Sequence, residues 1–214
     1  MGIMVMVQFR SATLYDVDRL ADIHSRCSMV QPGAFFYRFG SRFLREYYKI
    51  LVSSELSVIL CAEGHEGPLR GFVAGTVDAA KEFISLRKHR GSLVFAALPE
   101  ILRHPSLLGA LYSRNQSLFH FSPKSKFVVQ DGPRISYWAW DPQDTSNRFA
   151  IQLMQGFLDG MRSRGLQGVR LEIDRENRKV LLVHKLLGAR VVEEFETPDG
   201  GHRLFLEHTF HRVE

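Results

Sequence analysis

Two carboxylates, Glu172 and Asp174, stand two residues apart in the second half of the chain. Alternate residues of a strand face the same side, so both would project from one face of a strand predicted over 169–174. A carboxylate in that position can accept a proton as a general base. The simpler alternative is that the pair caps the next helix or binds Arg170 and Arg175, and both interpretations stay open.

A strand, a polar loop and a helix follow one another just before these carboxylates. Asp141-Pro142 ends the strand predicted over 134–140. An amphipathic helix is predicted over 151–165, with its first turn near Phe149. The first N–H groups of a helix have no partner within it, and they attract anions. The segment therefore predicts an anion site at the start of this helix.

The other elements specify the fold class. Further strands are predicted over 4–10, 57–63, 70–78, 189–195 and 203–210, and helices over 14–28, around 43–51 and over 178–187. A turn rich in glycine and proline between the second and third strands indicates a hairpin. In the second half, the order strand-helix-strand favours parallel pairing. We expect an α/β fold: a mixed sheet with helices on both faces.

Residues 80–130 interrupt this alternation. Pieces at 81–90, 92–103 and 106–120 have helical patterns and are separated by prolines. We interpret them as a helical insertion within a single domain, 1–214. The insertion either packs as a helical pair on the sheet or forms a lid that shapes a substrate pocket.

Composition is that of an ordinary globular protein with a basic surplus. The net charge of +5 favours anionic partners, and the densest cationic cluster, Arg87–Arg90, is typical of a solvated helix end. Two cysteines, Cys27 and Cys61, have no metal-ligand spacing and imply no disulfide framework. Without a signal-peptide pattern or an apolar run long enough to span a membrane, we expect a cytoplasmic protein with no metal.

Four residues, Pro142, Ala150, Asn177 and Gly188, stand in the register of a known pattern. With the opening segment 10–16, they make the chain resemble the GCN5-related N-acetyltransferase (GNAT) superfamily over nearly its whole length. The resemblance implies a splayed, mixed sheet and transfer of an acetyl group from acetyl-CoA to a primary amine.

The resemblance also implies which residues bind acetyl-CoA. Its pyrophosphate loop falls on Thr145, Ser146, Asn147, Arg148, Phe149 and Ala150, its pantetheine strand on Trp138, Ala139 and Trp140, and its conserved asparagine on Asn177. Two positions depart from the family: Arg148 replaces a glycine and Thr145 replaces an arginine. Arg148 either supplies a guanidinium to the pyrophosphate or obstructs it.

The catalytic residues implied are His184 and Glu172. His184 replaces the tyrosine that commonly protonates the leaving thiolate, and a protonated imidazole is a competent acid; the alternative is a half-buried structural histidine. Glu172 is the candidate base for the amine, with His24 and His120 as unranked alternatives. The acceptor wall implied by the family falls on Phe35, Phe36 and Tyr37, residues that also suit a core.

Three functions remain open at this point. The first is acetylation of a small-molecule amine; the insertion is similar to those of acetyltransferases acting on amino sugars. The second is transfer of a longer acyl chain from acyl-carrier protein, with Arg87–Arg90 meeting the acidic carrier. The third is a non-catalytic domain that binds a ligand or partner. No nucleic acid is implied, and a homodimer is one option.

Overall fold

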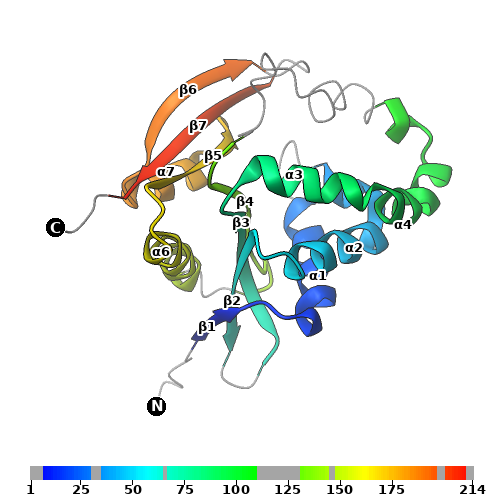
Figure 1. Ribbon diagram of the computed structural model, residues 1–214, viewed down its shortest axis with the longest axis horizontal. Helices are drawn as coiled ribbons and strands as arrows, with labels where there is room; N and C mark the ends of the chain where they lie inside the picture. The colour runs from blue at the N-terminus through cyan, green and yellow to red at the C-terminus, as the bar shows by residue number, and fades with distance from the viewer. Residues whose placement is uncertain are drawn as a thin grey trace.

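The computed structural model describes residues 7–29, 35–64, 67–109, 131–144, 148–196 and 201–210. Within these residues one seven-stranded sheet runs through the molecule in the order β1-β2-β3-β4-β5-β7-β6 (Figure 1). Its strands are β1 (Val7–Ser11), β2 (Ser57–Gly64), β3 (Leu69–Thr76), β4 (Arg134–Trp140), β5 (Gly168–Asp174), β6 (Arg190–Glu196) and β7 (His202–Thr209). All seven predicted strands are present, and the α/β fold class is confirmed.

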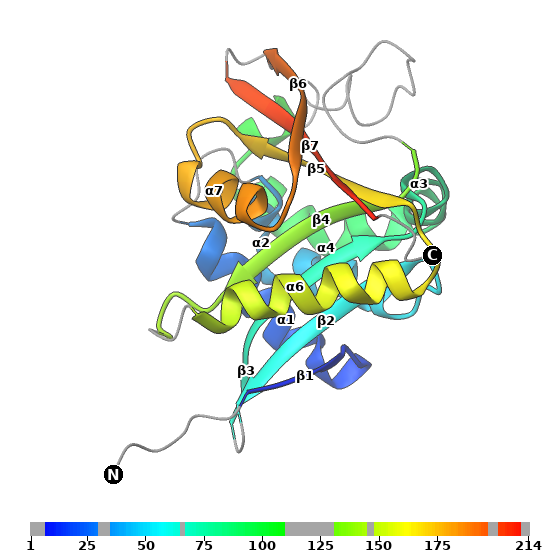
Figure 2. The ribbon, with the colours of Figure 1, turned by 90° about the vertical axis from the view of Figure 1, so that its left-hand side faces the viewer.

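The sheet is mixed, and its one parallel contact is its weakest. β4 and β5 run parallel and share a single registered pair, Arg134 with Arg170, whereas every other neighbouring pair is antiparallel with an extended register. From that pair the two strands diverge toward their C-terminal ends (Figure 2). We call this divergence the β4–β5 split.

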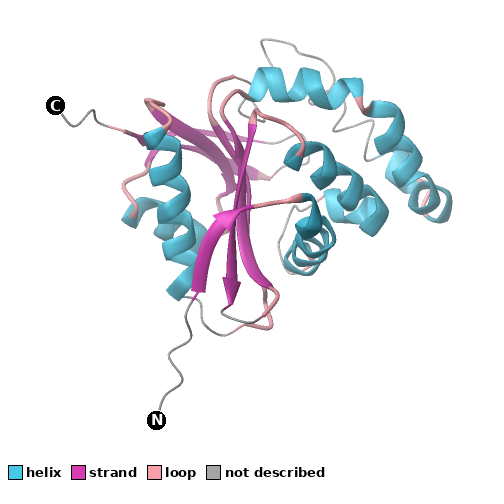
Figure 3. Cartoon of the chain, turned by 60° about the horizontal axis from the view of Figure 1, so that its bottom comes forward, coloured by secondary structure: helices cyan, strands magenta, loops and turns pink. Residues whose placement is uncertain are grey.

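Two layers of helices enclose the sheet (Figure 3). The helices are η1 (Leu14–Asp16), α1 (Val17–Ser28), η2 (Phe36–Phe39), α2 (Gly40–Val52), α3 (Ala79–Lys88), α4 (Arg90–Arg103), α6 (Arg148–Ser163) and α7 (Arg178–Leu186). The layer with α6 and α7 lies on one face, and the layer with α1 to α4 lies on the other. Helices on both faces were predicted, and they are confirmed.

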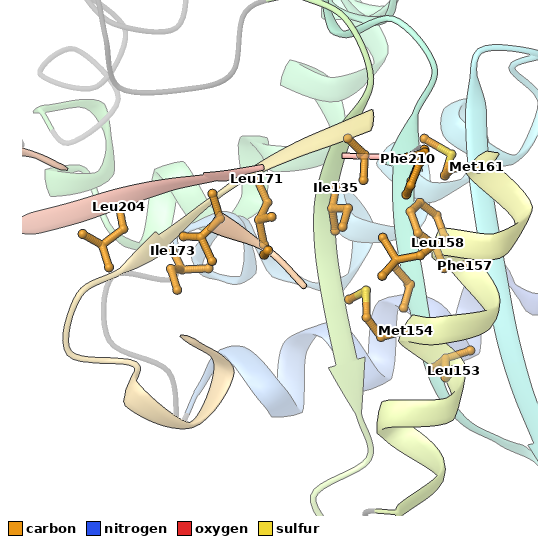
Figure 4. Close-up of a cluster of buried hydrophobic side chains, with 14 of the residues drawn as sticks. Ile135, Leu153, Met154, Phe157, Leu158, Met161, Leu171, Ile173, Leu204 and Phe210 are labelled. Atoms are coloured by element: carbon orange, nitrogen blue, oxygen red, sulfur yellow. The ribbon is translucent and has the colours of Figure 1, made fainter. Parts of the chain in front are cut away.

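Each face has its own core. Beneath α6, Leu153, Met154 and Phe157 pack on Leu171 and other strand residues (Figure 4). Beneath α1 and α2, a second cluster packs on the opposite face of β2, β3 and β4; it includes Leu20, Leu44, Tyr48, Phe72 and Ala139. The 3.6-residue spacing of these apolar side chains places them on one side of each helix, which is why the helices lie flat on the sheet.

The described part of the insertion contains α3, α4 and a helical turn at residues 106–109. α4 packs against α2 and η2, with Ala97 beside Phe35 and Phe39. Residues 110–130, which hold most of the third predicted helical piece and His120, lie outside the described residues. None of the described helices is both long and apolar enough to cross a bilayer.

Candidate functional site

A β-bulge in β4 marks the start of the β4–β5 split. Ile135 pairs with Gly75 and Tyr137 pairs with Ala74, so Ser136 has no partner on β3. A Cβ atom on Gly75 would lie 2.4 Å from the Arg134 carbonyl oxygen and 2.7 Å from Phe157. Gly75 therefore allows β3 to approach β4 closely where the bulge forms.

Buried polar atoms without a hydrogen-bond partner gather at this split. Seven such side-chain atoms occur among the described residues, and six belong to β4, β5 or α7. They are Arg134 Nε, Ser136 Oγ, Trp138 Nε1, Trp140 Nε1, Glu172 Oε2 and His184 Nε2. Because folded proteins satisfy most buried polar atoms, a concentration of this kind indicates a site that a polar ligand or ordered water completes.

His184 lies between two strands on the α6–α7 face. Its Nδ1 atom is 3.0 Å from Nε2 of His208 on β7, and its ring meets the Trp138 ring of β4 edge to face. The side chain is only 1% exposed. His184 thus connects β7 to β4 across β5, where the sheet divides.

Burial keeps both imidazoles neutral. It lowers the pKa of His184 to about 3, with a smaller contribution from His208. Burial also lowers the pKa of His208, while a hydrogen bond to the backbone of Leu187 acts in the opposite direction. A protonated His184, the form of the acid expected from the sequence, is therefore not the resting state; its catalytic role stays a prediction.

Glu172 lies on the opposite face of β5 from the α6 core, because its neighbours Leu171 and Ile173 belong to that core. Its Oε1 accepts a hydrogen bond from Arg134 at the start of β4, and its side chain is 9% exposed. The pairing suggested by sequence proximity is wrong: Arg170 binds Glu207 and Arg175 binds Glu194.

A second buried carboxyl group, Glu82 of α3, belongs to the same face. Ser57 Oγ donates to Glu82 Oε1 at 2.9 Å, and Glu82 is 6% exposed. Burial raises the pKa of Glu82, and hydrogen bonding and the charge of Arg134 oppose the shift. Arg134 therefore lies within the electrostatic reach of two carboxyl groups, one from β5 and one from the insertion.

The loop after β4 is anchored to α1. Asp141, 5% exposed, accepts from Arg19 at 2.6 Å and from Arg26 at 3.4 Å. Its Oδ1 also accepts from the backbone N–H of Gln143 at 3.0 Å. These contacts fix the direction in which the chain leaves β4 toward α6.

The predicted pyrophosphate loop is only partly described. Thr145, Ser146 and Asn147 lie outside the described residues. Arg148 begins α6 and is exposed, with its guanidinium 4.7 Å from the centre of the Phe149 ring, and Ala150 is buried. A cation therefore stands at the exposed start of α6, as an anion site requires.

Asn177 has a structural role that the resemblance did not give it. Its side chain caps α7 by accepting from the Val180 N–H at 3.4 Å. Trp138 and Trp140 both pack against the α6 core, whereas Ala139 belongs to the core under α1 and α2. Contacts of these residues with acetyl-CoA stay predictions.

The aromatic residues proposed for the acceptor wall lie in packing positions. Phe35 is buried beside Phe39, and Phe36 and Tyr37 pack against the core under α1 and α2. His24 is also buried, with Nδ1 2.6 Å from the Tyr48 hydroxyl, and burial lowers its pKa to about 3. Among the described residues no cluster of three or more His, Cys, Asp or Glu could hold a metal.

Sequence reasoning missed His208, Arg134 and Glu82. His208 occupies a core-facing position of β7 in register with buried Leu204 and Leu206, so a histidine in an apolar alternation was the available signal. Arg134 and Glu82 left no comparable signal, since a charged residue at a strand end or on a helix is ordinarily solvated.

Comparison with known proteins gives a fold and no sequence relative. Neither the family models nor the curated proteins include a match to this sequence. Solved structures do match. The ribosomal-protein-S18-alanine N-acetyltransferase from Escherichia coli is similar with a TM-score of 0.58 and 13% identity, covering 98% of this chain and 97% of that chain.

Two further structures agree. A GNAT-family acetyltransferase from Streptococcus pneumoniae has a TM-score of 0.60 at 11% identity, with 96% of this chain and 100% of that chain covered. A putative acetyltransferase from Salmonella typhimurium, solved with acetyl-CoA, has a TM-score of 0.61 at 11% identity, with 98% and 96% covered. Over nearly its whole length, the chain has the fold of the GNAT acetyltransferases.

Proposed function

We propose that the protein transfers an acetyl group from acetyl-CoA to the primary amine of a small molecule. The observation that carries the proposal is the group of unpartnered polar atoms at the β4–β5 split, within a GNAT fold. Acetyl-CoA would supply the acyl thioester, and its pantetheine arm carries two amides. Trp138 and Trp140 offer indole N–H donors and Ser136 offers a hydroxyl, so this donor set fits such an arm.

The start of α6 would hold the pyrophosphate. Arg148 stands there with an exposed guanidinium, and the first N–H groups of the helix add their partial positive charge. On the other face, Glu172 keeps one buried oxygen free of partners and would accept a proton from the amine or bind its ammonium form. In this proposal the donor and the amine would meet where β4 and β5 diverge.

An amine acceptor fits this second face because both of its buried carboxyl groups attract cations. The Escherichia coli structure is named for acetylation of an alanine of a ribosomal protein, so amines of more than one kind are reasonable acceptors to test. Buried, unpaired Cys27 and Cys61 suit the reducing cytoplasm, which is where we place the reaction.

Calorimetry with acetyl-CoA tests the donor site. Arg148→Glu should weaken binding at least about tenfold, because an anion replaces a cation beside a polyanion. Arg164→Glu is the matched control, since it makes the same charge change beyond the other end of α6. Equal affinity in both variants would remove Arg148 from the site, and no binding by the wild type would contradict the proposal.

Release of free CoA in the presence of candidate amines tests the transfer itself. The panel should include an amino sugar, a polyamine and a peptide with a free N-terminus. Acetyl-CoA binding without transfer to any amine would favour the non-catalytic alternative.

A second function, acyl transfer from an acidic carrier protein, is favoured by one observation. Val94, Phe95 and Leu102 of α4 are more than half exposed, and the basic segment Arg87–Arg90 runs from the end of α3 to the first residue of α4. Transfer from an acyl-carrier protein but not from acetyl-CoA would establish this alternative.

A further inference from the structure

The outward side of α4 is apolar, although a helix on the surface of a protein ordinarily carries its charges there. On the inward side, Ala96 and Ala97 are buried where α4 packs on α2 and η2. The outward side holds four large apolar side chains that are 60%, 67%, 41% and 71% exposed: Val94, Phe95, Leu98 and Leu102. Their spacing of one, three and four residues aligns them along the helix. We call these four residues the α4 stripe.

Cations lie at both ends of the α4 stripe and beside it. The exposed segment Arg87–Arg90 precedes the stripe at the junction of α3 and α4, and exposed Arg103 follows it at the end of α4. Arg42 of α2 places its guanidinium 5.7 Å from the centre of the Phe95 ring. The stripe is therefore an apolar surface with positive charge around it.

The insertion carries the whole basic surplus of the protein. Residues 80–130 contain eight of the 28 lysines and arginines but two of the 23 acidic residues, a net charge of +6, so the rest of the chain has a net charge of −1. Of these two acidic residues, Glu82 is buried and Glu100 binds Arg103 at 2.6 Å. Neither neutralises Arg87–Arg90. A surplus confined to one segment attracts an anionic partner to that part of the molecule.

We propose that the α4 stripe and the cations around it bind the surface of an anionic lipid bilayer. Apolar side chains along one helix, with lysine and arginine beside them, are the features of a helix that lies in a bilayer interface. The acyl chains would surround the stripe, and the lipid phosphates would pair with the cations. With 14 residues, α4 is about 21 Å long, less than the hydrocarbon core of about 30 Å, so it would lie on the bilayer.

An acidic protein would account for the cations of this surface, but the stripe favours a bilayer. From Val94 to Leu102 it extends over about 12 Å of helix, and a bilayer accepts apolar side chains along that whole length without a matching groove. This contact does not depend on the proposed acetylation. Because α4 and α6 belong to layers on opposite faces of the sheet, the start of α6 would stay open to water (Figure 3).

Sedimentation of the whole protein with lipid vesicles tests the proposal. The wild type should bind vesicles made of equal parts phosphatidylglycerol and phosphatidylcholine, and should bind far less to phosphatidylcholine alone. Added NaCl should weaken the binding, because salt screens the charges. Equal binding to the two kinds of vesicle, or binding to neither, would overturn the proposal.

Two pairs of substitutions test the apolar part of the surface. Phe95→Ser combined with Leu102→Ser removes the two most exposed side chains of the stripe and should weaken binding to the mixed vesicles at least about tenfold. Leu182→Ser combined with Leu186→Ser is the matched control on α7, where the side chains are 58% and 73% exposed, and should leave binding nearly unchanged. Undiminished binding by the α4 double variant would overturn the role of the stripe.

Charge reversal tests the cationic part. Arg87→Glu combined with Lys88→Glu should weaken binding at least about 20-fold, since each basic residue near an anionic surface contributes roughly fivefold. Arg164→Glu combined with Lys185→Glu makes the same change at exposed positions outside the insertion and should have a much smaller effect. Equal losses in the two double variants would show that net charge alone determines binding, and would overturn the assignment to α4.

Two further outcomes would assign the surface to a protein instead. One is binding of an acyl-carrier protein by a wild type that does not bind the mixed vesicles. The other is a dimer in light scattering that Phe95→Ser with Leu102→Ser dissociates, again without vesicle binding. Thermal melting shows whether each variant is folded. If one is not, the lipid and salt dependence of the wild type still decides.

Discussion

The two faces of the β4–β5 split bury polar groups in different ways. On the α6–α7 face, His184 and His208 are neutral and share a hydrogen bond. On the other face, Glu172 and Glu82 lie close to one cation, Arg134. A neutral, hydrogen-bonded pair can accept or pass on a proton, whereas a group of charged side chains attracts a charged ligand. This division fits proton transfer on one face and amine binding on the other.

The difference also gives the two faces opposite pH dependence. Histidines with lowered pKa values destabilise the folded state as the pH falls, because the unfolded chain takes up protons that the folded chain refuses. A glutamic acid with a raised pKa acts in the reverse sense: its contribution favours folding at low pH and is lost as the pH rises through its unfolded value of 4.5 and toward its folded one.

The largest expected effect is on turnover. His184→Ala should lower kcat about 10²–10⁴-fold, the usual range for a lost proton-transfer group, and leave acetyl-CoA affinity nearly unchanged. Steady-state rates combined with calorimetry measure the two separately. Unchanged turnover would make His184 a structural residue and remove the functional contrast between the faces.

On the charged face, the largest effect should be on stability. Arg134→Met leaves Glu172 buried without its cation and should lower the free energy of unfolding by about 3 kcal/mol. Arg170→Met is the control, because Arg170 is paired with Arg134 in the sheet but its ion pair with Glu207 is exposed. That variant should lose less than about 1 kcal/mol in urea unfolding. Equal losses would show that the two ion pairs do not differ.

The neutral face can be tested by acid. His184 has a folded pKa of about 3 and an unfolded value of 6.5, so stability should be lost as the pH falls through this interval. Between pH 6.5 and about pH 5 the loss from this residue is about 2 kcal/mol. Urea unfolding of His184→Gln should show a correspondingly shallower dependence than the wild type. Parallel curves would contradict the neutral, buried assignment.

A smaller effect is expected at the bulge that separates the faces. Gly75→Ala would place a methyl group 2.4 Å from the Arg134 carbonyl oxygen, and the resulting strain should cost about 1–3 kcal/mol. Gly91→Ala, in α4, has no atom within 4 Å of the new methyl group and should be neutral or stabilising by up to about 1 kcal/mol. Thermal melting of the two variants gives the comparison.

The strands and helices were predictable because apolar residues recur in each at the spacing of that element, every second residue in a strand and about every 3.6 residues in a helix. β4 was placed over 134–140 and the helix before β5 within three residues of its observed start. The charge pairs were not predictable. One alternative paired Glu172 with Arg170 or Arg175, but its partner, Arg134, is 38 residues away and is brought near by the parallel contact of β4 and β5. Partners of that kind depend on the pairing of strands, which local periodicity does not encode.

Only part of the proposed donor site could be predicted from the sequence. The resemblance to the family pattern predicted Trp138 and Trp140 for the donor and His184 for catalysis. The state of His184, on α7, depends on His208 of β7 and on burial, which exists only in the assembled sheet. The unperturbed pKa of a histidine favoured a protonated His184 as the acid. Burial in the folded protein lowers that pKa.

The bulge at Ser136 also bears on how β4 can change in length. Ile135 and Trp138 point to the same core only because Ser136 stands outside the alternation. Deleting Ser136 would give a regular strand in which every neighbouring side chain keeps its face. Deleting Ala139 would instead bring Ser136 into the alternation and turn Tyr137 and Trp138 over, so that each would face the core that the other now contacts. Deletion of Ser136 should therefore leave both cores packed. It would remove the bulge at the β4–β5 split, where we place the substrates.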